Sequence, residues 1–218
     1  MKKLPIGIQT FSKVIQDNLM YVDKTEVAHH LIENGSYFFL SRPRRFGKSL
    51  FLDTLKEVFE GHRELFKGLY IEDKWDWEDQ SPVIRISFGA GVVTNISNLH
   101  ENIRWNLESC EKDLGIKSDR DPIITRFRYL IATAHQKYGK KVVVLVDEYD
   151  KPILDNITDK EQARAIRDEM KNFYSVIKDS DAHIRFVFIT GVSKFSKMNL
   201  FSGLNNLNDI TLDSKYST

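Results

Sequence analysis

Apolar residues along the chain fall into two patterns, short continuous runs and longer stretches at helical spacing. The continuous runs predict five strands, at residues 36–41, 82–88, 142–147, 184–190 and about 209–212. The run at 142–147 is the clearest, because it consists almost entirely of Val and Leu. Strands that are apolar throughout are typical of parallel sheets buried on both faces. The pattern therefore predicts an α/β fold with a mostly parallel, five-stranded sheet.

The stretches between these runs predict the helices that cover the sheet. Apolar residues recur every three or four positions within residues 23–35, 48–61, 99–114, 121–134 and 163–178. Asp23 and Asp121 are the expected N-caps of two of these helices, and Pro122 is the expected first helical residue of the second. We expect an N-terminal segment and helix over residues 1–35, followed by a core over residues 36–218.

Composition narrows the class of protein only slightly. The 218 residues are 41% hydrophobic and 29% charged, with a net charge of +1, so no overall field favours nucleic acid or a membrane. The lone Cys110 excludes an internal disulfide and suits a reducing compartment. No apolar run reaches the roughly 18–20 residues of a membrane span, and the N-terminus lacks the apolar region of a signal peptide. We expect a cytoplasmic protein.

The stretch FLSRPRRFGKSLFLDTL, from Phe39 to Leu55, places Gly47-Lys48-Ser49 between a predicted strand and a predicted helix. This is the context of a phosphate-binding loop, G-x-x-x-x-G-K-[ST]. In such a loop, backbone N–H groups and the helix N-terminus hold the phosphates, the lysine reaches the β- and γ-phosphates, and the hydroxyl serves Mg²⁺. The candidate nucleotide-binding residues are Arg44, Arg45, Phe46, Gly47, Lys48, Ser49 and Leu50.

The loop departs from that pattern at its first position, where Arg42 replaces the usual glycine. Pro43 pushes Arg42 towards an extended conformation and removes one N–H group from the loop. The early part of the cradle should therefore differ, and arginine side chains at 42, 44 and 45 would compensate with charge. Because Gly-Lys-Ser recurs by chance, a solvated turn before a helix is the alternative.

Two further segments support a nucleotide site. VVVLVDEYD is a hydrophobic strand that ends in Asp147 and Glu148, the form of a Walker B motif. Asp147 would hold Mg²⁺ together with Ser49, and Glu148 would activate the attacking water. In VFITGVSKFS, Thr190 or Ser193 would sense the γ-phosphate. Taken singly, each segment is also compatible with a surface turn, but the order of the motifs favours the nucleotide site.

Several segments together resemble the AAA-ATPase-like domain family: LPIGIQTF, YVDKT, FLSRPRRFGKSL, VLVDEYDKPI and FITGVSKFSKMNLFSGLNNLNDITL. In that family, arginine in place of the first glycine is usual. The resemblance implies a P-loop NTPase three-layer sandwich of the AAA/ASCE-like kind, with the sensor strand between the Walker A and Walker B strands. It also implies that relatives commonly continue into a helical lid and a PD-(D/E)XK nuclease-like domain.

The function that follows is an ATP-binding, Mg²⁺-dependent P-loop ATPase that couples its nucleotide state to a partner or an attached domain. Lys48, Glu148, Thr190 and Ser193 would act in hydrolysis, with Ser49 and Asp147 at the metal. The alternative is a nucleotide-controlled interaction module that binds ATP without appreciable hydrolysis. A phosphotransferase is less favoured because no sequence pattern indicates a pocket for an acceptor. A GTPase is less favoured because no [NT]-K-x-D motif is present. Self-association or a nuclease-like domain are the candidate partners, and nucleic acid is not indicated.

Other segments carry weaker signals. YVDKT (21–25) would lie near the adenine or simply open a helix, and WDWED (75–79) would stack on a base or pack beneath a loop. The six histidines show no spacing typical of a zinc site.

Overall fold

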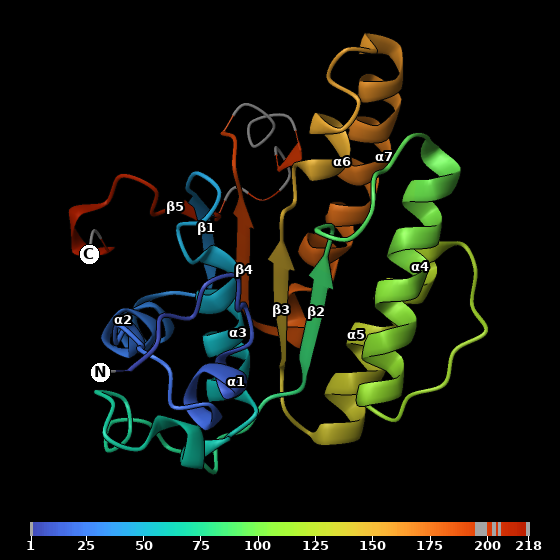
Figure 1. Ribbon diagram of the computed structural model, residues 1–218. Helices are drawn as coiled ribbons and strands as arrows, with labels where there is room; N and C mark the ends of the chain where they lie inside the picture. Colours follow the sequence, from blue (N-terminus) through green and yellow to red (C-terminus); the bar gives the residue numbers. More distant parts are fainter. Residues whose placement is uncertain (1, 195–199, 202–203, 205, 217–218) are drawn as a thin grey trace.

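Five parallel strands form one sheet at the centre of the molecule, in the order β2-β3-β4-β1-β5 (Figure 1). The structure, a computed structural model, describes residues 2–194, 200–201, 204 and 206–216. The strands are β1 (Tyr37–Ser41), β2 (Val83–Ser87), β3 (Val142–Asp147), β4 (Ile184–Gly191) and β5 (Asn208–Asp209). The α/β class and the five-stranded sheet predicted from the apolar runs are confirmed, and every pairing is parallel.

The strand order places β4 between β1 and β3. The strand before the Gly-Lys-Ser loop and the strand that ends in Asp147 are therefore separated by the strand that ends near Thr190. This is the order implied by the family resemblance. Because the strands are parallel, all three segments that follow them start from the same carboxyl edge of the sheet, where open α/β sheets bind their ligands.

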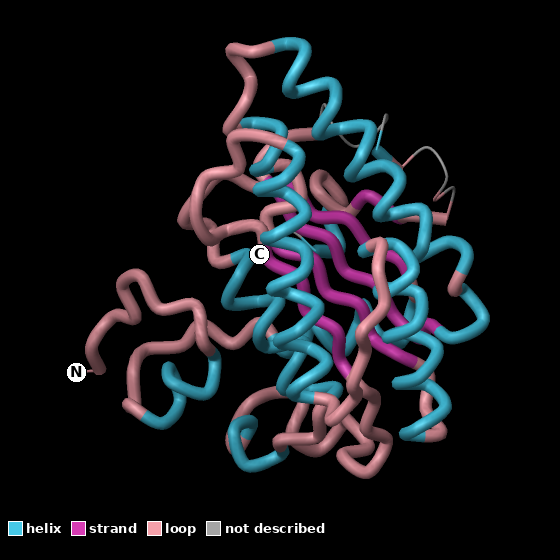
Figure 2. Tube along the Cα trace, turned by 90° about the vertical axis from the view of Figure 1, so that its right-hand side faces the viewer, coloured by secondary structure: helices cyan, strands magenta, loops and turns pink. Residues whose placement is uncertain are grey.

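Helices cover both faces of this sheet (Figures 1 and 2). They are α1 (Phe11–Gln16), α2 (Thr25–Asn34), α3 (Lys48–Phe59), α4 (Ile96–Asp113), α5 (Ile123–Tyr138), α6 (Lys151–Leu154) and α7 (Lys160–Asp179). Short 3₁₀ helices occur at Arg63–Phe66, Asp181–His183 and Ser214–Tyr216. No helix within the described ranges combines the length and the apolar character needed to cross a membrane.

Each central strand is apolar throughout because its successive side chains enter two different cores. In β3, Val144 and Val146 join the core beneath α4, α5 and α7, whereas Val143 and Leu145 join the core beneath α1, α2 and α3. The same alternation holds from Phe186 to Ile189 of β4. Burial on both faces removes the polar positions that a half-exposed strand would show, so the continuous runs in the sequence follow from the three-layer arrangement.

Two local predictions need correction, and one pair of alternatives is decided. The last strand was expected at about 209–212 but covers only Asn208–Asp209, where it pairs with Phe38 and Phe39 of β1. Asp121 does not cap α5; Pro122 occupies the cap position, and no described side chain caps this helix. Of the two alternatives for residues 75–79, packing is confirmed, because Trp75 and Trp77 are buried in the core beneath α3.

Candidate functional site

The loop between β1 and α3 carries two residues in the left-handed conformation, Arg45 with φ +68° and Gly47 with φ +73°. Gly47 stands at the cap position of α3, and no described side chain accepts a hydrogen bond from the first N–H groups of this helix. A helix N-terminus of this kind carries partial positive charge and free donors. The loop therefore presents backbone donors suited to an anion at the carboxyl edge of the sheet.

Lys48 is buried, with 7% of its surface exposed, and lies back over its own loop. Its Nζ donates a hydrogen bond to the carbonyl oxygen of Pro43 at 3.0 Å. Burial lowers the pKa of Lys48, while the carboxylates of the segment 147–150 act in the opposite direction and the Arg44 guanidinium lowers the pKa further. The lysine is therefore a poorly hydrated cation that faces a group of acids from the neighbouring strand.

Asp147 ends β3 and is 2% exposed. Its Oδ1 accepts a hydrogen bond of 2.6 Å from the hydroxyl of Thr190, which is itself fully buried at the end of β4. This contact fixes the orientation of the carboxylate and occupies the threonine hydroxyl. Asp147 is thus held by the neighbouring strand, while Ser49 lies in the first turn of α3 at the same edge of the sheet.

Glu148 adopts a left-handed backbone conformation with φ +53°, which is uncommon for a residue with a side chain. Burial is the main cause of its raised pKa, and the adjacent Asp147 adds to it; Lys151, Lys48 and Arg44 lower it. Gly89 is a neighbour of this side chain, since a Cβ atom there would lie 3.5 Å from the Glu148 carboxylate, an ordinary contact distance. The environment makes Glu148 a stronger proton acceptor than an ordinary surface glutamate.

The three arginines of the loop differ in their surroundings. Arg42 donates from its guanidinium to the carbonyl of Thr211, and its backbone N–H donates to Gly191 at 3.2 Å. Arg44 and Arg45 are exposed, but the charge of Arg44 acts on both Lys48 and Glu148. Arg42 therefore anchors the start of the loop, and Arg44 contributes charge to the site.

The other predicted site residues differ in how much of their surface is exposed to solvent. Phe46 is 67% exposed, whereas Ser49 and Leu50 are half-buried in α3. Ser193 is also half-buried, and its backbone carbonyl accepts a hydrogen bond of 2.7 Å from the Tyr149 hydroxyl. The structure thus brings the loop, the acids after β3 and the segment after β4 to one edge, as their order in the sequence predicted.

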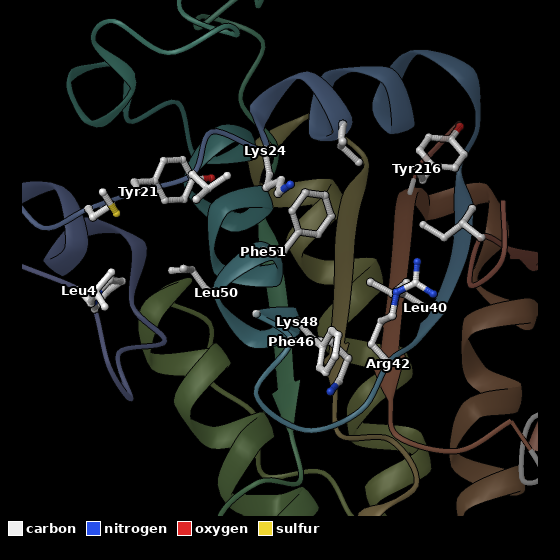
Figure 3. Close-up of a pocket in the computed structure, with 16 residues that line it drawn as sticks. Leu4, Tyr21, Lys24, Leu40, Arg42, Phe46, Lys48, Leu50, Phe51 and Tyr216 are labelled. Carbon is white, nitrogen blue, oxygen red and sulfur yellow. The ribbon is translucent and has the colours of Figure 1, made fainter. Parts of the chain in front are cut away.

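A cavity of about 330 Å³ lies beside the loop, between the N-terminal segment and α3 (Figure 3). Its described lining residues are mostly apolar and include no Asp or Glu: Leu4, Pro5, Met20, Tyr21, Val22, Lys24, Val27, Leu40, Arg42, Phe46, Gly47, Lys48, Leu50, Phe51, Ile210 and Tyr216. Gly47 and Lys48 belong to both the loop and the cavity wall. The loop of backbone donors and an apolar slot are therefore continuous.

Part of the cavity wall lies in a segment that the sequence had singled out. Tyr21, Val22 and Lys24 of the YVDKT segment line it, while Asp23 Oδ1 accepts hydrogen bonds of 2.8 and 2.7 Å from the backbone N–H and hydroxyl of Thr25. The segment thus forms part of the cavity wall and leads into α2, where Lys24 occupies the cap position predicted for Asp23; its place near an adenine stays a prediction. Leu4 and Tyr216 were missed, because segments at opposite ends of the chain meet only in the folded protein.

A separate cluster lies at the other end of α3. Glu57, Glu60 and His62 bring three potential ligand atoms within 4.8 Å of one another, which the histidine spacing did not predict. Lys56 Nζ lies 3.3 Å from Glu57 and 2.7 Å from Glu60, so the two carboxylates already have a cationic partner. The cluster forms an ion-pair network at the end of the helix.

Comparison with known proteins agrees with this geometry. The family described as predicted AAA-ATPase matches residues 5–201. The chain is 59% identical over 217 residues to a protein of Azotobacter chroococcum mcd 1 described as "Uncharacterized protein in vnfD 5'region". The match covers 99% of this chain but 42% of that relative, so the chain spans less than half of the relative's length. No solved structure matches the chain. The chain belongs to the predicted AAA-ATPase family.

Proposed function

We propose that this chain binds ATP together with Mg²⁺ and hydrolyses it to ADP and phosphate. The observation that carries the proposal is the position of Lys48. This buried cation belongs at once to the loop of free backbone donors, to the wall of the apolar cavity and to the electrostatic field of the acids after β3. A triphosphate attached to a flat apolar base would engage these surroundings simultaneously.

The phosphates would lie on the backbone N–H groups of the loop and the first turn of α3. Lys48 would exchange its hydrogen bond with Pro43 for the β- and γ-phosphate oxygens, and Arg44 would add charge from the exposed side of the loop. The N–H groups of residues 44–50 form the proposed cradle. Because the cavity lining offers no described carboxylate to the N–H groups of guanine, we expect ATP to bind better than GTP.

The residues at the proposed metal position fit Mg²⁺, which prefers oxygen ligands. Ser49 offers a hydroxyl, and Asp147 offers a carboxylate oriented by Thr190. When bound, Mg²⁺ would neutralise charge that develops on the phosphates. Thr190 acts in this scheme by holding Asp147, while Ser193 is the candidate for reading the γ-phosphate.

Glu148 would accept a proton from the attacking water or orient it. Its raised pKa favours that role, and its carboxylate lies beside Gly89 at ordinary contact distance. Most of the rate would come from positioning and electrostatic stabilisation. In longer relatives, or with a second copy of the chain, we propose that the nucleotide state is passed on to the attached or neighbouring protein.

The experiment measures Mg²⁺-dependent binding of ATP, ADP and GTP by calorimetry and phosphate release on the same preparation. We expect ATP to bind better than GTP, phosphate to be released slowly, and Glu148→Gln to bind ATP normally while releasing less phosphate. Binding of ATP without phosphate release would favour the alternative function, a nucleotide-controlled interaction module. Binding of no nucleotide would overturn the proposal.

A further inference from the structure

Asp150 is a fully buried carboxylate two residues beyond the proposed base Glu148. It stands at the cap position of the short helix α6, just after the carboxyl end of β3. Within the ranges that the structure describes, no Lys, Arg or His forms an ion pair with it; its hydrogen bonds come from backbone N–H groups. A buried carboxylate held in this way is costly and needs accurately placed donors.

The donors belong to the segment that follows β4. The N–H of Val192 lies 3.2 and 3.1 Å from the two carboxylate oxygens, and the N–H of Ser193 donates to Oδ2 at 2.6 Å. The neighbouring Tyr149 adds two bonds in the same direction. Its N–H donates to the carbonyl of Thr190 at 3.0 Å, and its hydroxyl donates to the carbonyl of Ser193. Residues 149–150 and 190–193 are thus fastened together through both backbone and side chains.

Close packing stiffens this junction further. A Cβ atom on Gly191 would lie 2.4 Å from ring carbons of Tyr149 and 2.6 Å from Asp150 Oδ1. Such distances leave no room for a side chain, so Gly191 lets the two segments approach as closely as they do. The junction fixes Ser193 relative to Glu148, whose left-handed backbone must be held by its surroundings.

We propose that Asp150 is a positioning residue that holds Glu148 and the segment 190–193 in a fixed relation, so that the groups that meet the γ-phosphate are arranged before ATP binds. This inference rests on the proposed function. Asp150 does not line the cavity, and its hydrogen bonds among the described residues go to Val192 and Ser193, so its effect on position runs through this segment and Glu148, while its charge acts on Lys48. Removal of its side chain should therefore weaken the contacts with the γ-phosphate and slow turnover. Binding of the adenine base and the β-phosphate should remain largely intact.

The charge of Asp150 predicts the direction in which ADP affinity changes when the residue is replaced. Asp150 is one of the acids whose field raises the pKa of Lys48, and it also repels an incoming polyanion. Loss of this charge should therefore make ADP binding equal or tighter. A variant that merely damages the fold would instead weaken the binding of every nucleotide.

The experiment compares Asp150→Asn, Asp150→Ala and Tyr149→Phe with the parent chain. The Asn variant keeps one acceptor oxygen, and the Phe variant keeps the ring while removing the hydrogen bond to Ser193. Glu111→Gln is the control, because Glu111 is also a buried carboxylate but pairs with Arg126 between α4 and α5, away from the site. For each protein, Mg²⁺-dependent affinity for ATP and ADP, turnover and thermal stability are measured.

We expect turnover to fall about 10- to 100-fold in Asp150→Ala, less in Asp150→Asn and least in Tyr149→Phe. Losses of this size are typical when reacting groups are slightly misplaced. The preference for ATP over ADP should fall in the same order, with ADP affinity within about twofold of the parent or tighter. Amide hydrogen exchange at residues 192–193 should speed up in the Ala variant. Glu111→Gln should lower thermal stability without changing the nucleotide preference.

The outcomes separate this inference from the proposed function. If the parent binds and hydrolyses ATP but all three variants keep its turnover and nucleotide preference, the positioning role is wrong while the ATPase stands. If the parent binds ATP without hydrolysis, the positioning role is tested by two measurements: the preference of the variants for ATP over ADP, and amide exchange at residues 192–193. Values unchanged from the parent in both would contradict the role. Should Asp150→Ala fail to fold, Asp150→Asn and Tyr149→Phe decide alone. Equal losses for ATP and ADP in those variants would reduce Asp150 to a structural residue.

Discussion

Replacement of Lys48 by methionine removes the charge that connects the loop, the cavity and the acids, while keeping most of the side-chain volume. In the proposed complex, Lys48 gives up one hydrogen bond of 3.0 Å to Pro43 and gains contacts to phosphate oxygens. A charge-assisted contact contributes about 1.5–3 kcal/mol, and the bond given up offsets about 1 kcal/mol of it. The net contribution is about 0.5–2 kcal/mol, or roughly 2- to 30-fold in ATP affinity.

The acids beside the lysine move the expectation to the upper end of that range. Asp147, Glu148 and Asp150 all raise the pKa of Lys48, so all three face its ammonium group closely enough to interact. Without the cation, they repel the triphosphate. We therefore expect ATP to bind about 10- to 30-fold more weakly to Lys48→Met, with the loss larger at low salt.

The assay is calorimetric titration of Mg²⁺-ATP into the parent chain, Lys48→Met and Lys48→Arg. Lys48→Arg keeps the charge and should retain more of the affinity than Lys48→Met. Because burial lowers the pKa of Lys48 and the phosphates oppose that shift, the parent should take up protons on binding ATP at alkaline pH. Binding of ATP to Lys48→Met within twofold of the parent, with the same proton uptake, would refute the assigned position of the lysine.

Three further predictions follow from the site. Glu148→Gln should raise the melting temperature at pH 7 but not below about pH 4: a raised folded-state pKa makes the ionised carboxylate unfavourable to folding, and that penalty is absent below the unfolded-state pKa. An unchanged melting temperature at pH 7 would argue against a strained carboxylate. The acid limb of the turnover–pH profile should lie above the ordinary pKa of a glutamate, because Glu148 must be ionised to act as a base; a limb at the ordinary value would contradict this. Gly191→Ala should cost about 1–3 kcal/mol through the clash with Tyr149 and Asp150, lowering the melting temperature by about 2–12 °C, whereas Gly89→Ala, with nearest contacts of 3.4–3.5 Å, should change it little.

The sheet could be predicted from the sequence because its cause is local. A strand buried on both faces is apolar at most positions, and β1, β3 and β4 are recognisable from that property. β5 is different. It makes only two residue pairs with β1, and the apolar run that suggested a longer strand reflects the burial of Ile210 rather than further pairing. Burial and strand pairing coincide in the centre of the sheet but not at its edge.

The candidate site was predictable in its motifs and less so in its supports. Gly47-Lys48-Ser49 and Asp147 follow predicted strands, so parallel topology alone brings them to one edge. The hydrogen bonds of Asp150 could not be predicted from one sequence, because its partners are backbone N–H groups some 40 residues further along. The cavity was equally hidden, since its wall combines the two ends of the chain. Contacts of this kind exist only once the tertiary structure is formed.

The arginine that replaces the first glycine of the loop has a physical explanation in these contacts. A glycine would let the chain leave β1 by a tight turn, but here the backbone N–H of Arg42 bonds to Gly191, so pairing with β4 continues one residue past the strand. The guanidinium then holds the carbonyl of Thr211, beyond β5. The left-handed conformations come later, at Arg45 and Gly47. The start of the loop is therefore tied to both neighbouring strands, and the turn that would receive phosphate is moved next to α3. A glycine at position 42 would lose the guanidinium anchor, and it would gain freedom at a point where the extended chain does not use it.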